Sequence, residues 1–170
     1  MSIKAAPTGH SRILAVGTYR PRRVVPNSEI VDRIDSTDEW IVQRTGIESR
    51  RFAGDDETVI SMAKAACEMA LQGAKLTIED IDTVILATIS YPFQAPSAAT
   101  ELINELGNPK AAAFDISAAC AGFCYGVAMG SDLVRTGTSR NVLVIGVEKL
   151  SDYTDPDDRA TAFIFADGAG

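Results

Sequence analysis

The sequence predicts an α/β fold whose sheet is mostly parallel and is covered by helices on both faces. Short apolar runs of strand length alternate along the chain with longer segments of helical periodicity. Glycines or prolines separate most of these segments, as expected at turns. The 170 residues are 46% hydrophobic and 23% charged, which suffices for one globular core. Together these observations favour a single α/β domain.

Composition excludes several classes of function. A net charge of −7 argues against nucleic acid as a main partner, because phosphate binding needs a basic face. Asp115 and Ser117 interrupt the apolar stretch 111–130, so a buried strand and helix explain it better than a membrane span. The three cysteines, without a secretory signal, indicate free thiols and a cytoplasmic location. With His10 as the only histidine, we expect no zinc site.

The first quarter of the chain is the least regular part. We expect a flexible tail at 1–12, followed by a strand at 13–18 that ends at Gly17. Asn27 or Ser28 can cap a short helix over 29–34, since a short oxygen-bearing side chain satisfies the free N–H groups there. The charged stretch 36–51 is predicted to be a surface insertion with its own short helix.

The remaining elements have clearer patterns. Apolar and small residues recur at helical spacing from 57 to 73, and the two later helices end before Gly107 and Gly137. Thr77 is expected to start a single helical turn, and 152–158 is an acidic loop. Helices are therefore predicted at 57–73, 97–106 and 118–136, and strands at 82–90, 111–116, 141–147 and 161–166.

The segment 114–123 carries the strongest chemical signal. An apolar strand runs into a turn of small residues, and a helix begins near Cys120. This arrangement is that of a nucleophile elbow, with sulfur in place of oxygen. A helix N-terminus favours the thiolate, small neighbours admit a bulky thioester, and backbone N–H groups can hold an oxyanion. The alternative is that Cys120 is a small buried core residue.

The other two cysteines have simpler interpretations. Cys124 follows Cys120 by one helical turn and is either a resolving thiol or, as we favour, a packing residue on the same buried face. Cys67 lies on an Ala-rich helical face and is expected in the core.

Four blocks of residues, in this order along the chain, resemble β-ketoacyl-acyl-carrier-protein synthase III. The blocks are 36–41 with 44–47, then 96–99, then 115–123, and finally 158–159 with 163–170. The resemblance implies a thiolase-like fold, with layers α-β-α-β-α when complete, of which 13–170 is the N-terminal half. On this resemblance the half is incomplete without a C-terminal half that carries a catalytic His and Asn.

The resemblance also implies the reaction. An acyl group passes from acyl-CoA to Cys120, and a decarboxylative condensation with malonyl-ACP then gives β-ketoacyl-ACP, the first condensation of type II fatty-acid synthesis. No metal or redox cofactor is implied, since CoA enters as part of a substrate. A homodimer is implied, with 111–116 and 92–96 as contacts. The 170 residues alone are not expected to catalyse condensation.

Further site residues follow from matched positions. Trp40 and Arg159 match the pair that holds the CoA adenine, Ser36 matches a hydroxyl that bonds CoA, and Arg44 is a candidate phosphate contact. From the residues alone, Trp40 could be packed, Arg159 could form a surface ion pair, and Arg44 could pair with Glu39 or Glu48.

Two positions bear on the acyl pocket. Phe165 matches a residue near the pocket, although an apolar strand residue is also ordinary core. Ala95 stands where acetyl-specific relatives place an aromatic side chain that reaches into the partner's pocket. The smaller side chain predicts that branched or longer acyl groups are accepted.

Other functions stay open at this stage. A polyketide starter synthase or another acyltransferase of the same fold would use the cysteine alike. A non-catalytic thiolase-like binding subunit is a different class, against which the joint presence of Cys120, Trp40 and Arg159 argues. A cysteine hydrolase lacks a base histidine near its motif in this chain.

Overall fold

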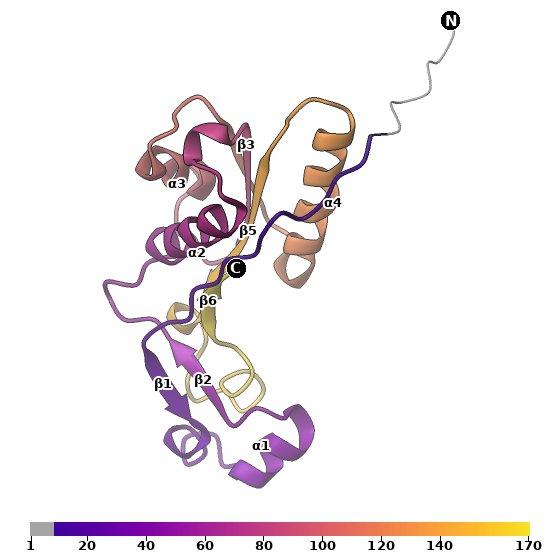
Figure 1. Ribbon diagram of the computed structural model, residues 1–170. Helices are drawn as coiled ribbons and strands as arrows, with labels where there is room; N and C mark the ends of the chain where they lie inside the picture. Colours follow the sequence, from indigo (N-terminus) through magenta and orange to yellow (C-terminus); the bar gives the residue numbers. More distant parts are fainter. Residues whose placement is uncertain (1–8) are drawn as a thin grey trace, which may run out of the picture.

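The computed structural model describes residues 9–170, which form two regions joined at a narrow junction (Figure 1). The larger one, here the sheet region, holds a four-stranded sheet with the order β4-β3-β5-β6. Strand β3 (Thr83–Ala87) is parallel to β4 (Ala112–Ile116) and to β5 (Val142–Lys149). Strand β6 (Asp167–Ala169) is antiparallel to β5. The predicted mostly parallel sheet is therefore confirmed.

Helices cover the sheet on both faces, as predicted (Figure 1). Helices α2 (Val59–Ala74) and α3 (Ala98–Leu106) pack on one face, and α4 (Gly122–Arg135) packs on the other. Thr58 and Ser61 form a capping box at the start of α2. Ser97 caps α3, which ends at Gly107 with a left-handed φ of 94°.

Helix α4 approaches the sheet through glycines. A Cβ added at Gly126 would lie 2.8 Å from Cγ1 of Val144, and one at Gly130 would lie 3.1 Å from its Cγ2. The residues of α4 that are buried are Gly122, Gly126 and Gly130. Small residues at these positions let the helix backbone lie directly on β5.

The second region, here the small region, is built on an antiparallel pair of strands. Strand β1 (Arg23–Pro26) pairs with β2 (Ser49–Phe52), and α1 (Asp38–Thr45) precedes β2. Within residues 9–170, the single-turn helices are η1 (Asn27–Glu29), η2 (Ile78–Asp80), η3 (Ala119–Ala121) and η4 (Leu150–Asp152). The predicted short helix in 36–51 and the turn after Thr77 are confirmed.

Arg50 and Asn27 organise the small region from inside. The Arg50 guanidinium is buried and donates to the carbonyls of Val25 and Phe163 and to Asn27 Oδ1. Asn27 in turn donates to Asp38 and to the Ile47 carbonyl. Burial lowers the pKa of Arg50. Asn27 is thus a buried hydrogen-bonding centre, and neither Asn27 nor Ser28 is the helix cap that we expected, because Pro26 precedes η1 at that position.

Three sequence-based assignments are wrong. No strand forms at 13–18, where the chain is extended and only Tyr19 makes a β-bridge, to Ala169. In the range 29–34, Glu29 is the last residue of η1 and 30–34 form turns. The range 161–166 is a turn over 161–164 and irregular at 165–166, because Ala162 and Phe163 pack into the core of the small region. The predicted tail 1–12 lies mostly outside the described residues.

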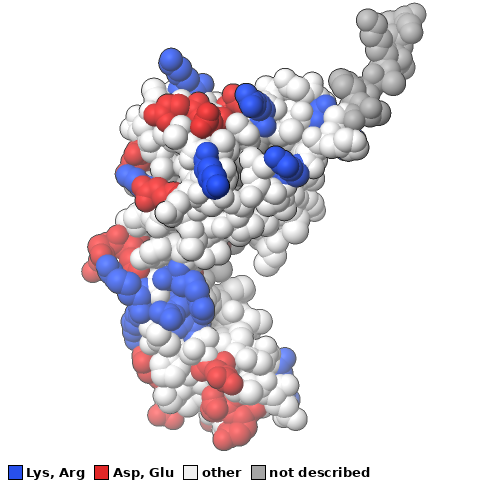
Figure 2. All heavy atoms as spheres, viewed as in Figure 1, with Lys and Arg blue, Asp and Glu red and all other residues white. Residues whose placement is uncertain are grey.

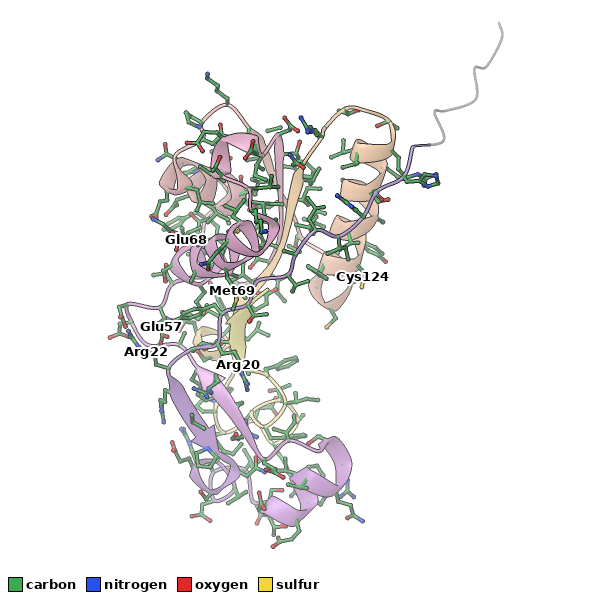
Figure 3. All side chains as sticks on the ribbon, viewed as in Figure 1. Arg20, Arg22, Glu57, Glu68, Met69 and Cys124 are labelled. Atoms are coloured by element: carbon green, nitrogen blue, oxygen red, sulfur yellow. The ribbon has the colours of Figure 1, made fainter. Side chains whose placement is uncertain are left out.

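A buried carboxylate fastens the junction between the two regions. Glu57 accepts hydrogen bonds from the Tyr19 hydroxyl at 2.6 Å, the Gly54 N–H at 2.8 Å and the Arg22 N–H at 3.0 Å. Figure 3 shows Arg22 beside Glu57 at this point, and Figure 2 shows the basic side chains that gather around it. The start of α2 is thereby tied to the chain that enters the small region.

Candidate active site

Cys120 lies on the turn between β4 and α4. It is the central residue of η3 (Ala119–Ala121), and α4 begins two residues later. Ala119 has a φ of 45°, a left-handed conformation that costs a non-glycine residue free energy and is typical of constrained active-site turns. The thiol is exposed. The alternative that Cys120 is a buried core residue is therefore wrong, whereas its role as a nucleophile stays a prediction.

A cavity of about 350 Å³ opens beside the cysteine. It lies at the carboxyl end of β3 and along β5, the edge of a parallel sheet where ligands commonly bind. The walls are apolar apart from one carboxylate and the thiol. The lining residues are Ala87, Ala119, Cys120, Phe123, Gly146, Val147, Glu148, Leu150, Ile164, Phe165, Ala166 and Gly168. Phe165 is thus part of the cavity wall, whereas its role in an acyl pocket stays a prediction.

Glu148 is a site residue that sequence reasoning missed. Its carboxylate accepts hydrogen bonds from the Ile89 N–H at 3.0 Å, from the Thr88 hydroxyl at 3.2 Å and from the Ser90 hydroxyl. These contacts hold the loop after β3 against the end of β5. The sequence did contain a signal for this residue, because Glu148 directly follows the apolar run 142–147. A carboxylate that is partly buried at the end of such a strand needs hydrogen-bond partners.

Asp115 holds the end of β4, which leads to the cysteine turn, against the start of α3. Its two carboxylate oxygens accept hydrogen bonds from the N–H groups of Ala98, at 2.9 Å, and of Ala99, at 2.7 Å. These are free donors at the N-terminus of α3, where a negative charge is favoured. The strand that leads to Cys120 is thereby fixed to α3.

A second cluster lies in the small region around Trp40. The indole ring packs edge-on against Phe163, with ring centroids 5.4 Å apart. The guanidinium carbon of Arg44 lies 4.3 Å from the indole centroid and that of Arg159 lies 5.9 Å from it. Arg44 therefore stacks on Trp40, and the pairing with Glu39 or Glu48 that we considered is not among the ion pairs of the described residues. Arg159 also makes an exposed ion pair with Asp35, at 3.7 Å.

The segment 162–166 connects the two clusters. Ala162 and Phe163 belong to the core of the small region, which Trp40 contacts. The next three residues, from Ile164 to Ala166, line the cavity beside Cys120. One short segment therefore forms part of the Trp40 cluster and part of the cysteine cavity.

The other two expected site residues, Ser36 and Ala95, do not line the cavity beside Cys120. The Ser36 hydroxyl is enclosed and has no hydrogen-bond partner within residues 9–170. Ala95 is exposed, in the loop before α3, and is not among the residues that line the cavity.

The remaining cysteines differ from each other. Cys67 is buried, as predicted, and burial raises the pKa of its thiol to about 12. Cys124 is exposed, so our expectation of a packing residue is wrong. Figure 3 shows it on the side of α4 away from the sheet, because the glycines occupy the side that meets β5.

Two further kinds of feature are absent from the described residues. Within the described part of the chain, no helix is long and apolar enough to cross a membrane. Among the same residues, no three His, Cys, Asp or Glu side chains gather closely enough to hold a metal ion.

Comparison with known proteins finds relatives that match this chain over almost its whole length. Residues 114–170 match the family model described as 3-oxoacyl-[acyl-carrier-protein] synthase III. A β-ketoacyl-[acyl-carrier-protein] synthase III from Kocuria rhizophila is 52% identical over 96% of this chain, and one from Streptomyces coelicolor is 54% identical over 98%. These matches cover 46% and 48% of the two relatives. The chain therefore spans about half the length of the curated relatives it matches.

Solved structures of related enzymes match the fold of this chain over almost its whole length. The priming β-ketosynthase of the R1128 polyketide pathway matches with a TM-score of 0.93 and 44% identity, over 99% of this chain and 51% of that one. The 3-oxoacyl-[acyl-carrier-protein] synthase III of Aquifex aeolicus matches with a TM-score of 0.89 and 43% identity, over 92% of this chain and 51% of that one. The expected α/β, thiolase-like fold class is confirmed.

Proposed function

Because this chain is related over almost its whole length to β-ketoacyl-acyl-carrier-protein synthase III, we propose that it supplies the acyl-accepting cysteine of such an enzyme. In the proposed reaction an acyl group moves from acyl-CoA to Cys120 and then condenses with malonyl-ACP. The observation that carries the proposal is an exposed thiol on a constrained turn, beside a mostly apolar cavity.

The proposed chemistry has two steps. The Cys120 thiolate attacks the thioester carbonyl, forms a new carbon–sulfur bond and expels CoA as its thiolate. Malonyl-ACP then loses carbon dioxide, and the resulting enolate carbon attacks the acyl-enzyme, which releases the Cys120 thiolate and β-ketoacyl-ACP. The His and Asn that the family uses for the enolate are expected in a further part of the protein. CoA enters as substrate, and the proposal includes no metal or redox cofactor.

The Trp40 cluster is the proposed site for the CoA adenine. Two stacking contacts at about 3.5–4 Å each require roughly 7–8 Å between the flanking groups. The 5.9 Å between Arg159 and the indole centroid is too short for this, so we expect Arg159 to swing outward when CoA binds. Its side chain is 56% exposed and free to do so. Arg44 is the candidate phosphate contact, and the Ser36 hydroxyl must become uncovered to bond CoA.

The acyl group is proposed to lie in the cavity, against Phe165. Since Ala95 lies outside the cavity of its own chain, we propose that it reaches the cavity of a partner in a homodimer. The small Ala95 side chain favours branched acyl groups. A comparison of isobutyryl-CoA with acetyl-CoA turnover tests this, and a strong preference for acetyl contradicts it. The free thiols favour the cytoplasm as the location.

A second candidate is the priming of polyketide synthesis. The similarity to the R1128 priming β-ketosynthase favours it, with a TM-score of 0.93. The acylation of Cys120 is the same in both cases, so only the acceptor carrier protein separates them. Turnover with carrier proteins from the two kinds of pathway is the measurement that distinguishes the candidates.

The direct test uses this chain continued to the length of its relatives, hereafter the longer protein. It is incubated with acyl-CoA and malonyl-ACP, and β-ketoacyl-ACP is measured by mass spectrometry. Cys120→Ala is expected to abolish the product. Cys124→Ala is the matched control and is expected to keep full activity, because Cys124 is exposed and does not line the cavity. Equal loss in both variants, or product formed by Cys120→Ala, contradicts the proposal.

A further inference from the structure

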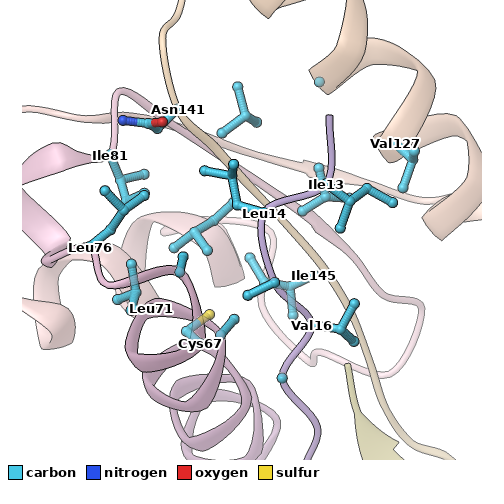
Figure 4. Close-up of a pocket in the computed structure, with 18 of the residues that line it drawn as sticks. Ile13, Leu14, Val16, Cys67, Leu71, Leu76, Ile81, Val127, Asn141 and Ile145 are labelled. Atoms are coloured by element: carbon cyan, nitrogen blue, oxygen red, sulfur yellow. The ribbon is translucent and has the colours of Figure 1, made fainter. Parts of the chain in front are cut away.

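Strand β5 ends in a carboxylate that shares a cavity with Cys120. The earlier part of the strand lines another cavity, of about 800 Å³, where Figure 4 shows Ile145 with Leu14 and mostly other apolar side chains. The last part lines the cavity beside Cys120, and Glu148 is the only carboxylate among the described residues that line it. A carboxylate in such a wall costs free energy unless it is hydrogen-bonded, so its partners indicate its role.

All hydrogen bonds to this carboxylate that involve the described residues come from one short segment, 88–90. The Ile89 N–H donates to its two oxygens, at 3.0 and 3.2 Å. The Thr88 hydroxyl donates at 3.2 Å, and the Ser90 hydroxyl donates as well. The side chains of Thr88 and Ser90 are buried, whereas Ile89 between them is exposed. Glu148 therefore fastens the three residues that directly follow β3.

These bonds extend the contact between β3 and β5 beyond their backbone pairing. The pairing ends with Ala87 opposite Gly146, and Glu148 lies two residues further along β5. The Ser90 hydroxyl also accepts a hydrogen bond from the Lys149 N–H, at 2.8 Å, as the carbonyl of a paired strand would. Side chains thus continue the contact where the strands no longer pair.

The two ends of the cysteine turn lie against the start of this fastened segment. A Cβ added at Gly122, the first residue of α4, would lie only 3.0 Å from the Cβ of Ala87. The Thr88 N–H donates to the carbonyl of Ile116, the last residue of β4, at 3.2 Å. Cys120 lies on the turn that connects Ile116 to Gly122. A displacement of Ala87 and Thr88 would therefore displace the turn.

We infer that Glu148 is a positioning residue for acyl transfer to Cys120. It holds 88–90 against the end of β5, and this segment begins where both ends of the cysteine turn rest. It acts through the segment and not as a proton donor or acceptor, because hydrogen bonds from 88–90 occupy both carboxylate oxygens. The inference rests on the proposed function of Cys120 as the acyl acceptor.

The test is the rate of Cys120 acylation in the longer protein, followed by rapid quenching and intact mass at increasing concentrations of acyl-CoA. Glu148→Ala is expected to lower the maximal rate by about 10- to 100-fold, since a displacement of about 1 Å can have such an effect. The half-saturating concentration is expected to change by less than about twofold, because the Trp40 cluster proposed for CoA lies in the small region.

Glu148→Gln separates position from charge. The amide keeps the shape of the side chain and one acceptor oxygen for the Ile89 N–H, and the hydroxyls of Thr88 and Ser90 can turn to accept from its NH₂ group. We expect its maximal rate within about threefold of the wild-type rate. A rate as low as that of Glu148→Ala would contradict a positioning role.

The matched control is Glu57→Ala. Glu57 also accepts hydrogen bonds from backbone N–H groups and a hydroxyl, but it does not line the cavity. Its maximal rate per folded protein is expected to equal that of the wild type. Wild-type protein that is not acylated at Cys120 would contradict the proposed function, and the inference with it. Normal acylation of the wild type together with an unchanged maximal rate in Glu148→Ala, or an equal fall in Glu57→Ala, overturns the inference alone.

Ser90→Ala supplies a milder variant, which leaves the carboxylate in place and removes one of its donors. Its maximal rate is expected to fall by about 3- to 10-fold. Added to Glu148→Ala, it should have little further effect, because both substitutions break the same contact. An unchanged rate in Ser90→Ala, or effects that multiply in the double variant, would contradict a route through the segment 88–90.

Discussion

The two faces of the sheet are built differently. On the α2 and α3 face, Met62, Ala63 and Leu102 are fully buried in one continuous core. On the other face, α4 buries its glycines against β5, and three of its large apolar residues are exposed: Phe123 by 45%, Tyr125 by 57% and Met129 by 42%. The first face is therefore covered by a packed core. The second face leaves apolar side chains exposed, and an exposed apolar surface of this kind is typical of an interface.

This difference bears on function. Cys120 lies at the start of α4, at the edge of this second face. The residues expected to complete the reaction, and the chain expected to cover α4, would both come from outside these 170 residues. The region that we propose for the chemistry therefore lies at the face of the sheet that these residues leave exposed.

The largest expected effect is a difference in the free energy of unfolding between two variants, one on each face of the sheet. Leu102→Ala should lower the free energy of unfolding by about 2–5 kcal/mol, since it leaves a cavity in a packed core. Met129→Ala, on the exposed face, should cost less than about 0.5 kcal/mol in the 170-residue chain. Urea unfolding measures both. Similar losses in the two variants would show that the faces do not differ in this way.

The next effect tests the close approach of α4. Gly126→Ala should destabilise by about 1–3 kcal/mol, because the new methyl would lie 2.8 Å from Val144. This loss must exceed the gain of about 1 kcal/mol in helix propensity. Ala128→Gly, on the exposed side of α4, is the control for propensity and should cost about 1 kcal/mol. A more stable Gly126→Ala variant would contradict the packing that we describe.

A third prediction concerns Glu57, the buried carboxylate at the start of α2 that fastens the junction between the two regions. Hydrogen bonds from the Gly54 N–H, the Tyr19 hydroxyl and the Arg22 N–H lower the pKa of Glu57 below its ordinary 4.5. A lowered folded-state pKa contributes stability above pH 4.5, and this contribution is lost as pH falls through the folded value. Glu57→Gln should cost about 1–3 kcal/mol at neutral pH and flatten the acid limb of the stability curve.

The control for this prediction is Asp56→Asn. Arg22 lowers the pKa of Asp56, but both side chains are about two-thirds exposed, so water screens the pair. We expect only a small change in stability at any pH. An unchanged acid limb in Glu57→Gln would mean that this carboxylate does not fasten the junction.

The smallest expected change in stability in the 170-residue chain is that of Tyr125→Ser. The same variant in the longer protein tests whether further chain covers α4. Tyr125→Ser should change stability by less than about 0.5 kcal/mol in the 170 residues, where Tyr125 is 57% exposed. In the longer protein the same variant should cost more than about 1 kcal/mol if further chain covers α4. Equal values in the two proteins would show that this face stays open to solvent.

The sequence predicted the elements whose signals are local. Helices α2 and α3 follow from periodicity, and α3 ends at Gly107 as expected. The turn that bears Cys120 was found because strand, small residues and helix follow one another along the chain. These features depend on neighbours in sequence, so a single sequence contains enough information to place them.

Features that depend on distant partners were missed. The segment 13–18 has strand-like residues, but a strand needs a pairing edge that this chain does not supply. The range 161–166 looks like a strand, yet Phe163 is buried against Trp40 in the small region. The hydrogen bonds of Arg50 and Glu148 join residues far apart in sequence, and no local pattern specifies them.

The most direct test of the account is the mass of the longer protein after incubation with acyl-CoA alone. We predict that one acyl group is added, that peptide mapping places it on the peptide containing Cys120, and that Cys120→Ala prevents it while Cys124→Ala does not. A folded longer protein that gains no acyl group, or that gains it on another residue, would contradict the assignment of Cys120 as the nucleophile.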